Sequence, residues 1–295
     1  MKTPIFIGCG VAIVTPFRGG EVDYAAFRQL IDWQIESGTD AIIVCGTTGE
    51  AAPLSPAERR KVIEVCVEQV NHRVPVIAGS GSNHTAHAVE LSREAQSIGA
   101  DGLLVVTPYY NKATQKGLIR HYFTVADAVE MPIIVYNVPS RTGVKCTAET
   151  YAILAEHPNV NGVKEASGDF ALITDTVNLC PADFTVWSGN DEETAAITLL
   201  GGKGVISVAA NIVPREMHDL CMLCFDNDFT AAGDLQRKLS ELLRALFCEV
   251  NPIPVKACME ELGLCTGELR LPLCDISPEN RARVKSAMER FGVVV

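Results

Sequence analysis

Short apolar segments rich in β-branched residues recur along the first two thirds of the chain and alternate with longer segments of helical spacing. The helical segments carry start and stop signals: Asp23 and Ser55-Pro56 precede two of them, and Gly99 closes a third. The predicted strands cover residues 11–15, 41–44, 74–78, 103–106, 133–136, 160–164, 184–187 and 205–208.

Eight strands that alternate with helices, each apolar on both faces, predict a parallel sheet closed into a (β/α)8 TIM barrel of the α/β class. A doubly wound open sheet is the alternative, but no GxGxxG turn follows the first strand. After residue 208 the period and the prolines predict helices at 214–225, 230–249, 254–262 and 278–291. We therefore expect a barrel domain over residues 1–227 and a C-terminal helical domain over residues 228–295.

Composition narrows the classes of protein. The formal net charge of −11 argues against nucleic acid or an anionic membrane as a partner, because both require clustered basic residues. The eleven cysteines are scattered through apolar segments without the spacing of a metal site, which indicates reduced thiols and no structural metal. No stretch reaches the roughly 18 uninterrupted apolar residues of a membrane helix. We expect a soluble cytoplasmic protein.

The segment 159–169 ends an apolar strand with a lysine, a residue that is poor in strands and costly to bury. Strand alternation predicts Val160, Gly162 and Lys164 on one face, and the missing side chain at Gly162 leaves space beneath the lysine stem. Glu165 is expected on the opposite face. Desolvation in an apolar pocket lowers the pKa of an amine, which can then form a Schiff base with a carbonyl. The alternative is a lysine that extends into solvent.

Other polar groups follow the carboxyl ends of the predicted strands, where active sites of such barrels lie. Residues 46–50 (GTTGE) place two hydroxyls between two glycines and are suited to holding a carboxylate, although an ordinary glycine turn is the alternative. Neither histidine nor an acidic cluster occupies these strand ends, which argues against a metal-dependent aldolase. The remaining strand-end groups include Tyr109, Tyr110, Tyr136, Arg141 and Ser188.

Five strand-end motifs are specific as an ordered set: GTTGE (46–50), TPYYN (107–111), YNVPSRTG (136–143), GVKEASG (162–168) and GVISV (204–208). With NPIPVK and LRLPL in the tail, this set resembles the dihydrodipicolinate synthases over essentially the whole chain. That family belongs to the pyruvate-dependent class I aldolases, which include N-acetylneuraminate lyase. The resemblance implies a lyase that condenses pyruvate with L-aspartate 4-semialdehyde to 4-hydroxy-tetrahydrodipicolinate, in the diaminopimelate route to lysine.

The resemblance also implies a role for each matching residue. Lys164 is expected to carry pyruvate as a Schiff base, so that no separate cofactor is needed, and Tyr136 to relay protons. Thr47 is expected to link Tyr136 to Tyr110 of a neighbouring subunit, in a homotetramer built as a dimer of dimers. The expected substrate-binding residues are Thr48 and Ile206 for pyruvate, Arg141 for the carboxylate of the semialdehyde, and Gly189.

A regulatory cleft is the place where the sequence departs from the family. Many members are inhibited by lysine between two subunits, where an acidic residue holds the amino group of the inhibitor. Asn83 and Tyr109 match this cleft, but His87 occupies the acidic position. A neutral or cationic histidine cannot replace a carboxylate opposite an ammonium group. We predict weak or absent inhibition by lysine.

Two competing interpretations stay open. A sugar-acid aldolase of the N-acetylneuraminate or keto-deoxy-gluconate type would share Lys164 and Tyr136, whereas Arg141 and the Tyr109-Tyr110 pair favour the dihydrodipicolinate synthases. A non-catalytic binding barrel that retained the pyruvate pocket would form no imine with pyruvate.

Overall fold

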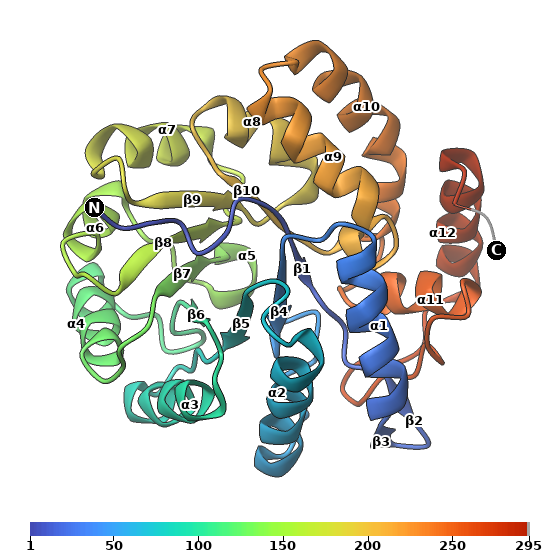
Figure 1. The fold of residues 1–295 in the computed structure, drawn as a ribbon, viewed down its shortest axis with the longest axis horizontal. Helices are drawn as coiled ribbons and strands as arrows, with labels where there is room; N and C mark the ends of the chain where they lie inside the picture. Colours follow the sequence, from blue (N-terminus) through green and yellow to red (C-terminus); the bar gives the residue numbers. More distant parts are fainter. Residues whose placement is uncertain (294–295) are drawn as a thin grey trace.

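The computed structural model describes residues 1–293, in which eight parallel strands close into a barrel (Figure 1). The hydrogen-bonded order is β1-β10-β9-β8-β7-β6-β5-β4, and pairing of β1 with β4 completes the circle. The predicted TIM barrel is therefore confirmed. The barrel strands are β1 (Gly8–Ala12), β4 (Ala41–Val44), β5 (Val76–Gly79), β6 (Gly102–Val106), β7 (Ile133–Asn137), β8 (Val160–Glu165), β9 (Thr185–Ser188) and β10 (Gly204–Ser207).

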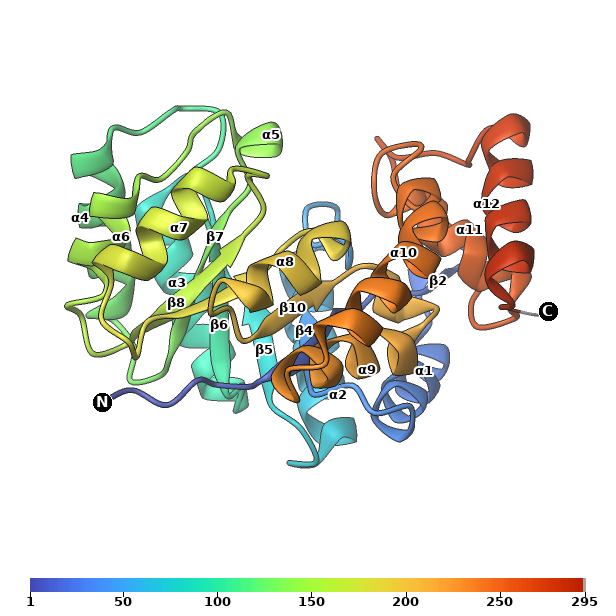
Figure 2. The ribbon, with the colours of Figure 1, turned by 90° about the horizontal axis from the view of Figure 1, so that it is seen from above.

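Helices connect the strands and cover the outside of the barrel (Figures 1 and 2). Asp23 caps the first helix by accepting a hydrogen bond from the backbone N–H of Ala26 at 3.0 Å, and Ser55 and Glu58 form a reciprocal capping box on the second. The helices are α1 (Tyr24–Glu36), α2 (Pro56–Val70), α3 (Thr85–Ile98), α4 (Gln115–Ala126), α5 (Pro139–Thr142), α6 (Ala148–Leu154), α7 (Phe170–Leu179), α8 (Thr194–Leu199) and α9 (Pro214–Phe225), with short 3-10 turns at Asp191–Glu193 and Ala209–Asn211.

The first strand covers Gly8–Ala12 rather than the predicted residues 11–15, because glycines in its first half hide it from a propensity pattern. Packing requires Gly10, since a Cβ atom there would lie 2.6 Å from Cδ1 of Ile43 and 2.9 Å from the ring of Phe6. Beyond the strand the chain forms a short hairpin of β2 (Phe17–Arg18) and β3 (Glu21–Val22), which the pattern did not predict.

Strand β8 contains an irregularity that changes the predicted faces. Its pairing with β7 shifts between Val160 and Gly162, so that Asn161 is an extra residue. Val160 packs in the outer core while Lys164 lines the cavity inside the barrel, so the prediction that they share a face was wrong. The absent side chain of Gly162 makes room for the adjacent strand, because a Cβ atom there would collide with the backbone oxygen of Thr185.

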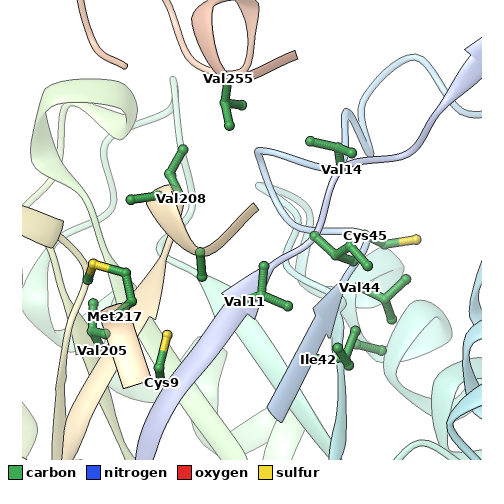
Figure 3. Packing of buried hydrophobic residues seen from close by; sticks show 14 of the residues in the cluster. Cys9, Val11, Val14, Ile42, Val44, Cys45, Val205, Val208, Met217 and Val255 are labelled. Atoms are coloured by element: carbon green, nitrogen blue, oxygen red, sulfur yellow. The ribbon is translucent and has the colours of Figure 1, made fainter. Parts of the chain in front are cut away.

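Apolar packing forms two layers separated by the sheet. Inside the barrel, Phe6 stacks on Trp187 with ring centroids 5.1 Å apart, and Phe6 precedes β1 and therefore fills the amino-terminal end. Outside, Figure 3 shows Met217 of α9 beside Cys9 and Val205. Two filled layers make the barrel a rigid support, and the carboxyl ends of its strands are left to form a site.

Three further helices follow the barrel and lie on one side of it (Figures 1 and 2): α10 (Phe229–Ala245), α11 (Ile253–Glu261) and α12 (Pro278–Phe291). Helix α12 packs against α10 and α11, and α10 packs against α8 and α9. The division of the chain into two domains at residue 228 stays a prediction. No helix within residues 1–293 has the length and apolar character needed to cross a membrane.

Candidate active site

A cavity of about 190 Å³ opens at the carboxyl ends of the barrel strands. Most of the predicted site residues line it, although they come from four different strand ends. Those present are Thr47, Thr48, Tyr136, Arg141, Lys164 and Gly189.

Lys164 is the buried amine of this cavity. Its side chain is only 5 % exposed, and its Nζ lies 4.5 Å from the centre of the Tyr136 ring. Burial lowers the pKa of Lys164 to about 8; the negative charge of Asp191 opposes this shift and the positive charge of Arg141 adds to it. The lysine therefore does not extend into solvent, and roughly a tenth of the molecules carry it uncharged at pH 7.

Glu165 points away from the cavity, as predicted. Its carboxylate accepts hydrogen bonds from the Tyr151 hydroxyl at 2.7 Å, from Nδ2 of Asn137 at 3.0 Å and from the backbone N–H of Ser167 at 2.9 Å. These bonds satisfy a buried carboxylate behind the sheet and fix the end of β8. The orientation of Lys164 follows from this anchoring, because adjacent strand residues point in opposite directions.

Tyr136 ends β7 with its ring against Lys164. Burial raises the pKa of its phenol, while the positive charge of Arg141 and a hydrogen bond with Thr47 act in the opposite direction. The phenol is protonated at neutral pH and can donate and accept protons beside the amine. Thr47 thus lies close enough to act on the pKa of Tyr136, and its predicted link to Tyr110 stays a prediction.

The Thr47-Thr48 loop is held by residues of α11 and of the segment that precedes it. The hydroxyl oxygen of Thr48 accepts a hydrogen bond from Nδ2 of Asn251 at 3.0 Å. Two residues on, the buried carboxylate of Glu50 accepts a hydrogen bond from Nζ of Lys256 at 2.6 Å. Glu50 adopts a left-handed conformation with φ of +48°, and this ion pair fixes the turn that presents both threonines.

Arg141 and Gly189 complete the predicted lining. Arg141 lies on the short helix α5, and its Nη2 donates a hydrogen bond to the backbone oxygen of Asn251 at 3.4 Å. This places a positive charge at the mouth of the cavity. Gly189 follows β9, and a Cβ atom there would lie 2.6 Å from Cβ of Ala166, so only glycine fits between β8 and β9.

Two predicted site residues lie elsewhere. Ile206 is fully buried inside the barrel, and Val208 is the residue of that strand end which lines the cavity. Tyr110 is 88 % exposed and does not line the cavity of its own chain. Its neighbour Asn111 donates a hydrogen bond from Nδ2 to the backbone oxygen of Asn83 at 3.0 Å, so this loop rests on the predicted regulatory cleft.

Sequence reasoning missed the contribution of the segment between α10 and α11, from which Phe247 and Asn251 line the cavity. It also missed Asp191, whose buried carboxylate accepts hydrogen bonds from the backbone N–H groups of Val208 and Ala209 at 3.1 and 3.0 Å and acts electrostatically on Lys164. The sequence contained little to indicate these roles, because NPIPVK predicts only the start of a helix and Asp191 predicts only a helix cap.

The geometry defines a class of protein. A buried amine of lowered pKa, set against a tyrosine at the carboxyl-terminal mouth of a parallel barrel, is the arrangement of lyases that hold a carbonyl substrate as an imine on lysine.

The chain belongs to the dihydrodipicolinate synthetase family, whose model matches residues 5–291. It is 50% identical over 292 residues to the 4-hydroxy-tetrahydrodipicolinate synthase of a Thermoanaerobacter species, covering 99% of this chain and 98% of that protein. The chloride-inhibited dihydrodipicolinate synthase of Acinetobacter baumannii, solved with pyruvate, aligns with a TM-score of 0.96 and 44% identity over 98% of this chain and 99% of that chain. The enzyme of Cyanidioschyzon merolae, solved with lysine bound, aligns with a TM-score of 0.96 and 38% identity over 99% of this chain and 100% of that chain.

Proposed function

We propose that this lyase condenses pyruvate with L-aspartate 4-semialdehyde to 4-hydroxy-tetrahydrodipicolinate through an imine on Lys164. The observation that carries the proposal is the Lys164 amine itself, buried at a strand end with its pKa lowered to about 8. The names of the relatives support the substrates. The Acinetobacter baumannii structure in complex with pyruvate supports the first of them.

The chemistry follows from the amine and the phenol. Neutral Lys164 attacks the ketone carbon of pyruvate, and loss of water gives an iminium that acts as an electron sink. Loss of a methyl proton gives an enamine, whose carbon attacks the aldehyde of the second substrate. Tyr136 supplies and removes protons at the carbonyl oxygens, and Thr47 orients its hydroxyl. The amino group of the second substrate then attacks the iminium carbon, which closes the ring, expels the Lys164 amine and gives the cyclic product, so the proposal requires no other cofactor.

The two carboxylates of the substrates are assigned to different groups. Thr48 binds the carboxylate of pyruvate through its hydroxyl and backbone N–H, and Gly189 lines the same cavity. Arg141 binds the carboxylate of the semialdehyde, because its planar guanidinium can make two parallel hydrogen bonds to that anion.

The proposal also includes the oligomeric state of the protein and its cellular location. The exposed side chain of Tyr110 is suited to entering the site of a neighbouring copy and reaching the exposed Thr47 there. We therefore propose a homotetramer built from two such dimers. All eleven cysteines are free, which supports a reducing, cytoplasmic location.

The pH dependence follows from the pKa of Lys164. Burial lowers this pKa to about 8, and only the neutral amine attacks pyruvate. At pH 7 roughly one molecule in ten carries the neutral form. We expect kcat/KM for pyruvate to rise with pH and to level off above about 8. If kcat/KM does not change between about pH 6 and about pH 7, this assignment is wrong.

Inhibition by lysine is expected to be weak or absent. His87 lies exposed on α3, with Nδ1 3.2 Å from a carboxylate oxygen of Glu90, and provides no carboxylate at its own position. Steady-state rates with millimolar L-lysine should stay close to the uninhibited rate. His87→Glu supplies the missing carboxylate and should increase sensitivity. A low-micromolar inhibition constant for the unaltered protein would contradict the prediction.

A coupled assay tests the reaction directly. Pyruvate and aspartate semialdehyde are supplied together, and dihydrodipicolinate reductase with NADPH consumes the product. Robust oxidation of NADPH that depends on both substrates is expected. If pyruvate forms an imine but the semialdehyde does not react, the function is that of a sugar-acid aldolase, and the role of Arg141 is wrong.

A further inference from the structure

We propose that Asn137 is a positioning residue, which joins the ends of β7 and β8 behind the sheet and so holds the Tyr136 phenol against the Lys164 amine. Asn137 directly follows Tyr136 at the end of β7, and Glu165 directly follows Lys164 at the end of β8. This inference rests on the proposed function and deepens it, because it names the contact that sets the distance between the phenol and the amine.

The two strands pair these four residues in register. Tyr136 lies opposite Lys164 and forms the inner pair, and Asn137 lies opposite Glu165 and forms the outer pair. Both residues of the inner pair line the cavity, with Nζ of Lys164 4.5 Å from the centre of the Tyr136 ring. Successive side chains point to opposite faces of a strand, so the outer pair lies on the helix side of the sheet. The separation of the outer pair therefore constrains that of the inner pair.

Two hydrogen bonds between side chains join the outer pair. Nδ2 of Asn137 donates to both carboxylate oxygens of Glu165, at 3.0 and 3.1 Å. Oδ1 of Asn137 accepts a hydrogen bond from the backbone N–H of Cys146 at 3.2 Å, and its backbone oxygen accepts one from the N–H of Ala166 at 2.9 Å. Both polar atoms of the Asn137 amide are thus bound in a fully buried position, which fixes its orientation.

Glu165 is matched to this amide by the arrangement of its donors. Besides the amide of Asn137, the backbone N–H of Ser167 donates to one oxygen at 2.9 Å and the Tyr151 hydroxyl to the other at 2.7 Å. Because Nδ2 of Asn137 contacts both oxygens, a glutamine at position 165 would turn its own NH₂ group toward that donor in either orientation. The residue required here is therefore a carboxyl group and not merely a side chain of this size.

Packing alone does not account for the polar pair. The other outward residues of these two strands are apolar and belong to the outer core: Ile133, Val135, Val160 and Val163. Apolar residues at the strand ends would continue that core without the cost of burying an amide and a carboxyl group. Hydrogen bonds depend on direction as well as distance, so the pair restricts the relative position of the two strand ends more narrowly than apolar contacts would.

This restriction matters for proton transfer. The phenol of Tyr136 must stay within hydrogen-bond reach of the oxygen that leaves as the Lys164 amine forms the imine. The carboxylate of pyruvate is assigned to Thr48, which follows β4 and takes no part in the outer pair. Loosening the outer pair should therefore slow the chemical steps and leave the binding of pyruvate nearly unchanged.

The first test measures kcat and the KM for pyruvate in Asn137→Ala and in Glu165→Gln, which keeps the volume of the side chain. Each should lower kcat by ~10-fold or more and change KM by less than about twofold, since a small misplacement of a reacting group is costly. Tyr122→Phe is the matched control. Its buried hydroxyl on α4 donates to the backbone oxygen of Val105 behind β6 at 3.1 Å. This control should lower the urea midpoint and leave kcat unchanged.

The second test separates positioning from stability. The rate of imine formation with pyruvate, trapped by borohydride at timed intervals, is measured for Asn137→Ala with Tyr136 present and in a Tyr136→Phe background. The loss caused by Asn137→Ala should shrink from ~10-fold to less than about twofold when the phenol is absent, because coupled residues are not additive. A change in the loss of this kind is not expected if Asn137 only stabilises the fold.

An undiminished loss in the Tyr136→Phe background would overturn the inference, and so would an unchanged kcat in either folded variant, Asn137→Ala or Glu165→Gln. Urea unfolding shows which variants are folded. If the unaltered protein forms no imine with pyruvate, the proposed function itself fails. If the unaltered protein forms the imine and turns over both substrates while these variants retain full activity, only the role of Asn137 is wrong.

Discussion

Lys164→Ala is expected to lower kcat/KM by ~10³-fold or more, the scale of loss seen when a covalent nucleophile is removed. The amine is buried in the cavity, and no other lysine lines it within the described chain. Lys164→Arg should be nearly as inactive, because a guanidinium stays protonated and cannot attack a carbonyl. The measurement is steady-state turnover in the coupled assay, with product formation followed over hours for the slow variants.

Lys116→Ala provides a matched control for this prediction. Lys116 lies exposed on α4, away from the cavity, so its removal takes away one lysine without touching the site. Its turnover should equal that of the unaltered protein. Retention of more than about a tenth of the activity in folded Lys164→Ala would show that the imine is not on this residue, since loss of a nucleophile is far more costly.

Lys256→Met is expected to lower the free energy of unfolding by about 3–5 kcal/mol. The side chains of Lys256 and Glu50 are both fully buried, with Nζ 2.6 Å from Oε1. Nζ also donates to the backbone oxygen of Glu268 at 2.6 Å and lies 4.3 Å from the centre of the Phe17 ring. Removing the cation leaves an unpaired carboxylate in the interior, which is the costly way to break a buried pair.

Lys256→Met should also affect the active site. Glu50 ends the Thr47-Thr48 turn, so the KM for pyruvate should rise in Lys256→Met more than kcat falls. Urea unfolding and steady-state kinetics measure the two effects. The double variant Lys256→Met with Glu50→Gln removes both charges and should recover part of the stability.

A surface pair is the control. Arg60, half exposed on α2, pairs with Glu64 at 2.9 Å, and Arg60→Ala should change the free energy of unfolding by less than about 1 kcal/mol. If the double variant at Lys256 and Glu50 is as unstable as the single one, lost packing and not an unpaired charge determines the stability, and the argument from the buried pair is wrong.

The sequence was sufficient to predict the barrel and the position of the buried amine. Parallel strands buried on both faces produce continuous apolar segments, and a lysine that ends one of them stands out. Thr48, Tyr136 and Arg141 were found for the same reason, since each follows a strand end and all strand ends meet at one mouth. Each of these residues is close in the sequence to the strand that positions it.

What could not be predicted depends on contacts between distant segments. Asn251 and Thr48 are 203 residues apart in the sequence, and no periodic pattern indicates that they meet. The bulge at Asn161 was missed because alternation assumes a regular strand, and it moved Val160 to the other face. The sequence analysis attributed the missing side chain at Gly162 to space beneath Lys164. In the structure, the backbone of the adjacent strand leaves no room for a side chain there.

The most direct test of the account is to trap the imine and locate it. The protein is incubated with pyruvate, reduced with borohydride, and digested for peptide mass spectrometry. We expect the mass of one reduced pyruvate per chain, on Lys164 alone, and none after Lys164→Ala. A modification on another lysine, or no modification while the coupled assay shows turnover, would contradict the mechanism derived from this site.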